Sequence, residues 1–210
     1  QPNAALASNG NKTDVSCNDA ADGSINLSVS GGTANYTFAW TKTGDSSYSA
    51  TTEDLNNLAP GTYNVTVTDA NDCTTTSSFT ITQPDQLVAT GTTSNKNGFG
   101  ISCNGAADGS INLSVSGGTA NYTFAWTKTG DNSYGATTED LSNLGPGTYN
   151  VTVTDANDCT TTASFTITEP VELTIADAGL STAIACYGDD GQIRVNITGD
   201  SNGNGSNQNY

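Results

Sequence analysis

The chain has no histidine and no methionine, and only five lysines and arginines stand against 21 aspartates and glutamates among its 210 residues. The absence of histidine excludes Ser-His-Asp triads, imidazole general bases and His-ligated zinc sites. The formal net charge of -16 leaves no clustered positive charge for nucleic acid or for an anionic membrane surface. We therefore expect a protein that is not an enzyme and that has no nucleic-acid partner.

Long apolar runs are also missing. Hydrophobic residues make up 34% of the chain, and no run reaches the roughly 18 residues that a membrane span needs. No basic stretch followed by an apolar one opens the sequence, so we expect any targeting segment to lie outside this piece. Charged residues make up only 12%, and the apolar residues alternate strictly, which indicates folded modules rather than disorder. We expect no membrane insertion by this segment.

Two long segments of the chain are almost identical. Residues 17–84 and 103–170 align without a gap at an offset of 103 − 17 = 86 residues, and they differ at seven positions. Tandem copies of this kind are typical of surface stalks, spacers and adhesins, and they are rare among catalytic domains. The repeat predicts a mechanical or binding module.

The two ends of the sequence contain fragments of the same pattern. Gln1-Pro2 matches Gln83-Pro84, and Cys186 with the alternating residues after it restarts the pattern of Cys17. We expect these repeats to belong to a longer array. The expected divisions are the end of a preceding repeat at 1–2, a first repeat at 3–84, a second at 85–170 and an incomplete third at 171–210.

Apolar and polar residues alternate with a period of two in four stretches of each copy. In the first copy the stretches are 25–29, 36–40, 63–67 and 79–81, and turn residues such as Gly31-Gly32 and Pro60-Gly61 separate them. A period of two indicates half-buried strands, and no stretch keeps a helical period. The chain is therefore expected to fold into short antiparallel strands.

Two aromatic residues in each copy favour an immunoglobulin-like arrangement. Trp40 falls on the third strand, and Tyr63 begins a later strand, where such sandwiches carry a tyrosine corner. Trp126 and Tyr149 hold the same places in the second copy. The predicted fold class is all-β, with tandem immunoglobulin-like (PKD-like) antiparallel β-sandwich repeats arranged as a rod.

The five cysteines are regularly spaced. Cys17 and Cys73 are 56 residues apart, as are Cys103 and Cys159, while Cys186 begins a third pair. If Cys17 lies near the start of the first strand and Cys73 at the head of the last, each pair closes a disulfide within its own repeat. Such a loop closure contributes about 4 kcal/mol in the chain-entropy model, and it points to an oxidising, extracytoplasmic setting. The alternative is buried free thiols in a reducing compartment.

Several motifs together resemble the SprB repeat. They are Cys-Asn-Gly-Ala-Ala-Asp-Gly-Ser-Ile at 103–111, Gly-Gly-Thr-Ala-Asn-Tyr-Thr-Phe-Ala-Trp at 117–126, Leu-Gly-Pro-Gly-Thr-Tyr-Asn-Val-Thr-Val-Thr-Asp-Ala-Asn-Asp-Cys at 144–159, and Thr-Ile-Thr-Glu-Pro at 166–170. The repeat is named for a large adhesin of gliding bacteria in the Bacteroidota. The resemblance implies a secreted filament on the outer cell surface, associated with the outer membrane, exported by the type IX system and gripping surfaces or polysaccharide. Asp19, where the second copy has Gly105, and Asp72 and Asp158, before cysteine, depart from the expected glycines.

The acidic loops are the candidate metal site. Hard oxygen donors cluster at a predicted hairpin tip in each copy, which is a setting that calcium prefers. The alternative interpretation is that these Asp and Asn side chains form side-chain-to-backbone turns that need no ion. The candidate ligands are Asp69, Asn71 and Asp72 in the first copy and Asp155, Asn157 and Asp158 in the second.

Two further groups of residues are candidates for a functional role. The neighbouring carboxylates Glu53-Asp54 and Glu139-Asp140 point to opposite faces of an extended chain, so they do not flank one bond as glycosidase carboxylates do. Tyr48, like Tyr134, either stacks on a sugar as an exposed aromatic or covers the edge of the core. No catalytic residue is predicted, and the ligand-binding residues remain unassigned.

The sequence thus favours a non-catalytic repeat array of a secreted, extracellular adhesin or filament that acts as a stalk or spacer. The expected partners are neighbouring repeats of the same chain and a polysaccharide or abiotic surface, with calcium as the one candidate cofactor. The first alternative is a carbohydrate-binding accessory module, for which an attached catalytic domain is the discriminating feature. The second is a self-assembling filament subunit that uses strand exchange.

Overall fold

A computed structural model describes residues 4–182 and 192–198 of the chain. Over these residues the regular elements are all β-strands, and no helix occurs. Consequently the described part has no helix of the length and apolarity that crossing a membrane requires. The chain divides into two compact units. One comprises Gln1–Val88, Ser116–Tyr122 and Thr154–Thr160, and the other comprises Ala89–Val115, Thr123–Val153 and Thr161–Tyr210.

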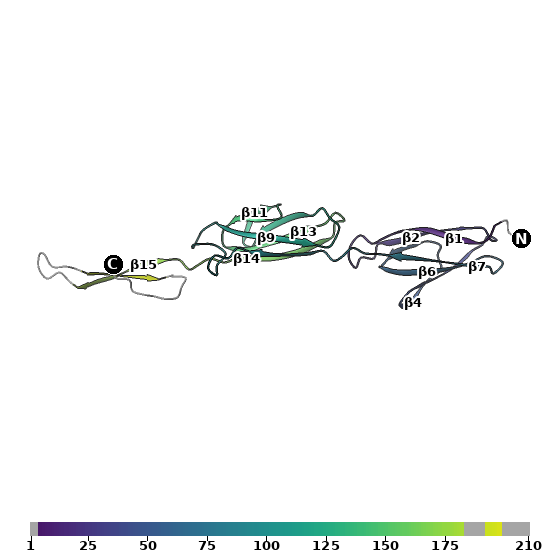
Figure 1. Cartoon of the computed structure of the whole chain (residues 1–210), viewed down its shortest axis with the longest axis horizontal. Helices are drawn as coiled ribbons and strands as arrows, with labels where there is room; N and C mark the ends of the chain where they lie inside the picture. Colours follow the sequence, from purple (N-terminus) through teal and green to yellow (C-terminus); the bar gives the residue numbers. More distant parts are fainter. Residues whose placement is uncertain (1–3, 183–191, 199–210) are drawn as a thin grey trace. The chain divides into compact units, whose positions relative to one another are not determined.

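The first repeat is a sandwich of two antiparallel sheets (Figure 1). One sheet has the order β1-β2-β5 and the other the order β4-β3-β6-β7. The chain therefore crosses between sheets after β2, after β4 and after β5, as in immunoglobulin-like sandwiches. The strands are β1 (Ala7–Thr13), β2 (Gly23–Ser30), β3 (Thr37–Lys42), β4 (Asp45–Ala50), β5 (Leu55–Leu58), β6 (Gly61–Thr68) and β7 (Thr74–Ile81).

The second repeat has the same topology. Its sheets have the orders β12-β9-β8 and β11-β10-β13-β14. Its strands are β8 (Val88–Thr93), β9 (Gly109–Ser116), β10 (Thr123–Lys128), β11 (Asp131–Ala136), β12 (Leu141–Leu144), β13 (Gly147–Thr154) and β14 (Thr160–Ile167). After it, β15 (Thr174–Thr182) and β16 (Gln192–Thr198) form an antiparallel pair, as β1 and β2 do. The all-β, immunoglobulin-like fold class is thereby confirmed.

Period-two alternation builds the core of each sandwich. In β6, Tyr63, Val65 and Val67 are buried, while the residues between them are half-buried. The register places Trp40 of β3 opposite Val65, and the Trp40 side chain is 1% exposed. Both sheets of each sandwich contribute such inward-facing residues. Their burial removes apolar surface from water, and this drives the packing of the two sheets.

The tyrosine corner is present in both repeats. The Tyr63 hydroxyl donates to the carbonyl oxygen of Ala59 at 2.8 Å, and Tyr149 donates to Gly145 at 2.9 Å. Both phenol rings are buried, so each hydroxyl needs the hydrogen bond that it makes. This part of the sequence prediction is confirmed.

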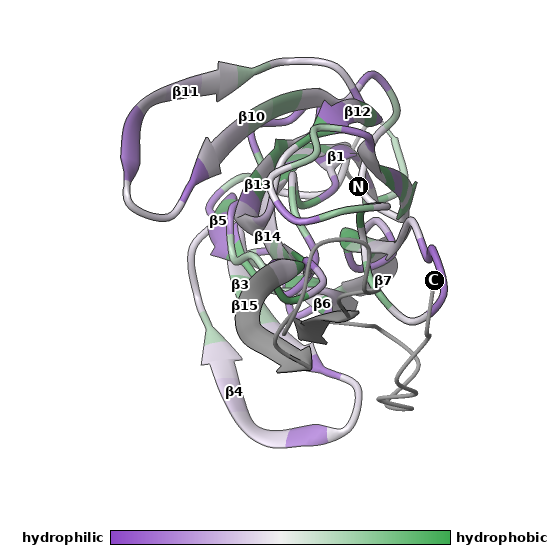
Figure 2. Ribbon diagram, turned by 90° about the vertical axis from the view of Figure 1, so that its left-hand side faces the viewer, coloured by the Kyte–Doolittle hydropathy of each residue, from purple (hydrophilic) through white to green (hydrophobic). Residues whose placement is uncertain are grey.

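The strands β4 and β11 lack the apolar alternation of the others. β4 has the sequence DSSYSA, and Tyr48 is its one large apolar side chain. The strand pairs with β3 at the edge of its sheet, and the turn that joins them is coloured hydrophilic in Figure 2. An edge strand of this composition forms through pairing with its neighbour rather than through burial of its own side chains.

A double-glycine turn fixes where each repeat begins. Gly31 and Gly32 have φ values of 70° and 63°, and the Gly32 N–H donates to the Ala4 carbonyl at 3.0 Å. A Cβ on Gly31 would collide with the carbonyl oxygen of Ala5, so the close approach requires glycine. The second repeat has the same turn, where Gly118 donates to Asp85 at 2.8 Å. The first strand of each repeat therefore lies before its first cysteine.

Candidate functional site

The cysteine loops, residues 14–22 and 100–108, follow the first strand of each repeat. In the first copy Asp22 accepts a hydrogen bond from the Ser16 N–H at 3.0 Å, and the Ala20 N–H donates to the Cys17 carbonyl at 3.1 Å. The Asn18 side chain donates to the carbonyl oxygen of Pro84, the last residue of the same repeat, at 3.2 Å, and this bond holds the loop against the end of the repeat. The same bonds recur in the second copy, from Ser102 to Asp108 at 3.1 Å, from Ala106 to Cys103 at 3.1 Å and from Asn104 to Pro170 at 3.1 Å.

Each cysteine loop lies beside the C-terminal end of the last strand. The Val15 N–H donates to the Thr82 carbonyl at 3.2 Å, one residue after β7 ends. In the second repeat Ile101 donates to Thr168 at 3.2 Å. We call this end of each sandwich the loop end.

The acidic hairpins, residues 69–73 and 155–159, join the last two strands at the other end of each sandwich, which we call the hairpin end. Asp69 is 4% exposed, and its carboxylate accepts backbone N–H groups from Thr33, Asn71 and Cys73, each at 2.9 Å. The Thr33 N–H is the main cause that lowers the pKa of this carboxyl, against burial, which raises it.

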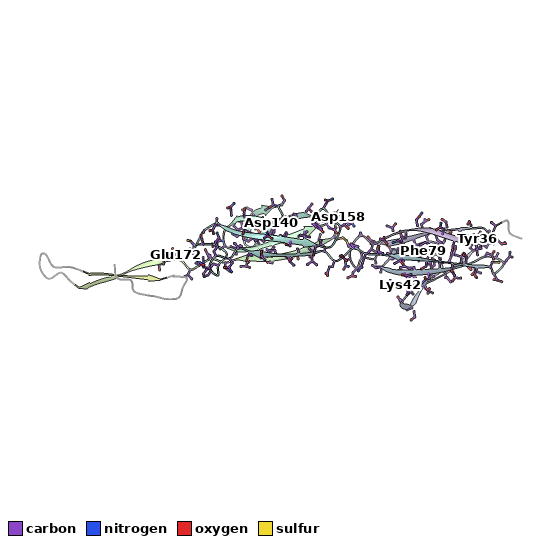
Figure 3. The ribbon with its side chains drawn as sticks, in the orientation of Figure 1. Tyr36, Lys42, Phe79, Asp140, Asp158 and Glu172 are labelled. Atoms are coloured by element: carbon purple, nitrogen blue, oxygen red, sulfur yellow. A yellow bond between two sulfur atoms is a disulfide. The ribbon has the colours of Figure 1, made fainter. Side chains whose placement is uncertain are left out.

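The hairpin of the second repeat is built in the same way. Asp155 accepts N–H groups from Thr119 and Asn157 at 2.8 Å and from Cys159 at 2.9 Å. Burial raises the pKa of Asp155, but the three N–H donors outweigh it, so the pKa is lowered overall. Figure 3 shows Asp158 at the hairpin end of the second repeat and Glu172 beyond its opposite end.

A disulfide joins the cysteine loop of the first repeat to the acidic hairpin of the second. Cys17 and Cys159 are bonded with an S–S distance of 2.01 Å and a Cα–Cα distance of 5.7 Å, and both lie in the compact unit that contains Gln1–Val88 and Thr154–Thr160. The Asn157 side chain supports the bond, because it donates to the Ser16 carbonyl at 3.0 Å and to the Thr119 hydroxyl at 3.0 Å. Cys73 and Cys103 are free and exposed.

The expected pairings of Cys17 with Cys73 and of Cys103 with Cys159 are wrong in this structure. These pairings require Cys17 near the start of the first strand, but β1 precedes Cys17, which therefore lies at the loop end. Cys73 lies at the hairpin end, where β7 begins. The eight residues of β7 span about 26 Å at ~3.3 Å per residue, whereas a disulfide needs Cα atoms within about 7 Å. Cys186 lies outside the described residues.

The candidate calcium ligands are arranged as side-chain-to-backbone turns. Both carboxylate oxygens of Asp69 already accept N–H groups, and Asn71 donates its side-chain N–H to the Thr33 hydroxyl at 2.7 Å. Asp72 and Asp158 are exposed at positive φ, at 59° and 64°. Across the described residues no three His, Cys, Asp or Glu side chains gather in a metal-binding group. Calcium binding at these loops stays a prediction.

The remaining polar candidates have structural partners. Asp54 accepts the Leu27 N–H at 2.9 Å, and Asp140 accepts the Leu113 N–H at 2.9 Å. The Tyr48 ring is half-buried and makes an edge contact with Tyr63 at 5.2 Å between centroids, which supports the interpretation that it covers the core edge. Burial, followed by the neighbouring Tyr63, raises the pKa of Tyr48.

Comparison with family models gives two matches. The SprB repeat model matches residues 9–44 and 101–130, which contain the first cysteine of each copy and the two strands after it. A sperm-tail PG-rich repeat model matches residues 143–170, in the second copy.

Comparison with curated proteins gave no match. Among solved structures, the amphioxus IgVJ-C2 molecule is similar at 16% identity and a TM-score of 0.30, over 65% of this chain and 90% of that one.

The two SprB matches end at equivalent glycines, Gly44 and Gly130, on the same turn of the two sandwiches. These matches lie at corresponding places in both copies and support a SprB-repeat family assignment.

Proposed function

We propose that this chain is a non-catalytic stalk or spacer segment of a secreted cell-surface adhesin. The observation that carries the proposal is the disulfide between Cys17 and Cys159, which ties one near-identical SprB repeat to the next. A covalent tie between successive modules resists separation under tension, which is the load that a surface stalk transmits. It also fits an oxidising environment outside the cytoplasm.

The chemistry of the repeats supports a structural role. The sequence has no histidine. The carboxylates of Asp54 and Asp69 accept hydrogen bonds from backbone N–H groups. A carboxylate held in this way stabilises a turn or a strand end, and it is poorly available as a general base or nucleophile. The polar residues of the repeats therefore serve the sandwich.

The SprB match supports a surface-exposed protein that takes part in adhesion or gliding. Within it, the repeats separate an anchoring part, associated with the outer membrane, from a part that grips polysaccharide or an abiotic surface. Export by the type IX system belongs to the same proposal. The formal net charge of -16 helps to keep neighbouring stalks apart by mutual repulsion.

The experiment replaces the repeats in the intact protein of the producing cell. Residues 4–170 are exchanged for an unrelated pair of β-sandwich repeats of the same length, and attachment of cells to glass and to polysaccharide-coated surfaces is measured. A spacer role predicts attachment close to that of the parent cells, whereas deletion of the same residues weakens it. Protease treatment of intact cells, followed by blotting for the segment, checks that the protein is exposed in each strain.

Loss of attachment in the exchanged strain, with the protein still on the surface, would show that the repeats themselves make the contact. Binding of the purified chain to a glycan array would then support the carbohydrate-binding alternative. A segment that is protected from protease in intact cells and released only by lysis would contradict the surface location itself.

A further inference from the structure

We propose that the bond between Cys17 and Cys159 is one instance of a link that each repeat makes with the next, so that Cys103 and Cys73 are the two open halves of the same link. Cys103 would bond the acidic hairpin of a following repeat, and Cys73 the cysteine loop of a preceding one. The partner is in each case another copy of this repeat in the same polypeptide. This inference concerns covalent assembly and does not depend on what the array adheres to.

The open cysteine loop is already built as the bonded one is. The bonds from Ser102 to Asp108, from Ala106 to Cys103 and from Asn104 to Pro170 reproduce those around Cys17 within 0.1 Å, although Cys103 has no partner. Over residues 16–22 and 102–108 the two copies differ only at Asp19 and Gly105, and both adopt positive φ, at 58° and 73°. The loop is therefore organised before the link forms.

The open acidic hairpin is organised in the same way. Residues 69–73 and 155–159 have the same sequence, Asp-Ala-Asn-Asp-Cys. Asp69 holds the Cys73 N–H at 2.9 Å, as Asp155 holds that of Cys159 at 2.9 Å. Of the seven positions at which the repeats differ, none lies in a hairpin. What distinguishes the two cysteines is exposure: Cys73 is exposed, whereas the bonded Cys159 is half-buried.

Neither open cysteine can bond the other cysteine of its own repeat. Cys73 lies at the hairpin end of the first repeat, and Cys103 lies at the loop end of the second. Within a single repeat, the length of the last strand separates the two cysteines, as described above. Each open thiol therefore needs a partner from a further repeat.

The bond forms by thiol–disulfide exchange with a small-molecule disulfide such as oxidised glutathione. A thiolate of one cysteine attacks the glutathione disulfide, releases one glutathione thiolate and forms a mixed disulfide. The second protein thiolate attacks the protein sulfur of that mixed disulfide and releases the second glutathione. In total, two protein thiols are oxidised to one disulfide, and one oxidised glutathione is reduced to two thiols.

The test lengthens the chain by one repeat. A second copy of residues 85–170 is inserted directly after Pro170, Cys186→Ser is introduced, and the protein is refolded in a glutathione redox buffer. Peptide mapping without reduction is expected to find two links, Cys17 with Cys159 and Cys103 with the inserted copy of Cys159. Cys73 and the inserted copy of Cys103 are expected as thiols.

The matched control is the same lengthened chain with Ser at the inserted copy of Cys159. It should leave Cys103 as a thiol and keep the bond between Cys17 and Cys159. The proposal is overturned if Cys103 of the lengthened chain stays a thiol while Cys17 is bonded, or if it bonds a cysteine of its own repeat.

A second measurement uses the unaltered chain and does not depend on the folding of the longer one. Alkylation of the native protein should label Cys73 and Cys103 and leave Cys17 and Cys159 unlabelled until a reductant is added. Labelling of Cys17 or Cys159 before reduction, or a bond between Cys73 and Cys103, would equally overturn the proposal.

Discussion

Removal of the disulfide between Cys17 and Cys159 should increase the length of unfolded chain that is released when the protein is pulled from its ends. Cys17 and Cys159 are separated by 142 residues, and while they are bonded those residues cannot lengthen a chain that is pulled from its ends. A fully extended chain spans about 3.3–3.6 Å per residue, so the hidden length is about 480 Å. The bonded Cα atoms are only 5.7 Å apart, and almost all of this length therefore becomes available when the bond is absent.

The assay is single-molecule force spectroscopy on the chain held by handles at its two ends. The oxidised protein should rupture without releasing the length of residues 18–158. The Cys159→Ser variant, or the same protein in reductant, should give two additional unfolding events, one for each sandwich. Serine keeps the backbone N–H that donates to Asp155, so the hairpin itself should persist in the variant.

The matched control is Cys73→Ser, which removes a free, exposed thiol at the equivalent hairpin position. It should behave as the oxidised parent does. Equal extracted lengths for the parent, the Cys159→Ser variant and the reduced protein would refute the reasoning, because the bond would then carry no load. Two sandwich unfolding events in the oxidised parent would refute it as well.

Three further predictions concern the sandwich and its hairpins. Tyr63→Phe should lower the free energy of unfolding by about 1 kcal/mol, because the Ala59 carbonyl loses its donor; urea denaturation measures this, and an unchanged midpoint would contradict it. Because folding lowers the pKa of Asp69, this carboxylate contributes fully to the free energy of unfolding above its unfolded pKa, and the contribution is lost as pH falls through its folded pKa. The Asp69→Asn variant should therefore lose less stability than the parent between neutral and acid pH. The same pH dependence of stability in both proteins would contradict this. The interpretation of the two hairpins as side-chain-to-backbone turns predicts the same melting temperature in calcium and in chelator, because the carboxylates of Asp69 and Asp155 already accept backbone N–H groups. Heat on calcium addition together with a raised melting temperature would instead establish the calcium site.

The fold was largely predictable because its signals are local. Alternation along β2, β3, β6 and β7 requires only that neighbouring residues face opposite sides of a strand, and the structure places strands over each of those stretches. The corner formed by Tyr63 was readable for the same reason, since it bonds a carbonyl four residues away. The edge strands β4 and β11 were not predicted, because they form by pairing with the neighbouring strands β3 and β10 and carry no apolar alternation of their own.

The disulfide was not predictable from spacing, because it depends on which end of the sandwich each cysteine occupies. The equal separation of 56 residues suggested closure within each repeat, but any cysteine pair in a tandem array recurs at equal spacing, whichever copies it joins. The deciding fact is that β1 runs before Cys17, and β1 has a polar sequence, ASNGNKT, with no apolar alternation to reveal it. The signal that was available is the double glycine at Gly31-Gly32, which needs an earlier segment to pack against it.

The bond between Cys17 and Cys159 also makes the chain resistant to being cut in two. Any single backbone cleavage between these cysteines, including one in the exposed turn after β3, leaves both fragments attached through sulfur. With bonds that recur every 86 residues and each cover 142, successive covered stretches overlap by 142 − 86 = 56 residues. A nicked array of this design would stay in one piece among the proteases that meet a cell surface.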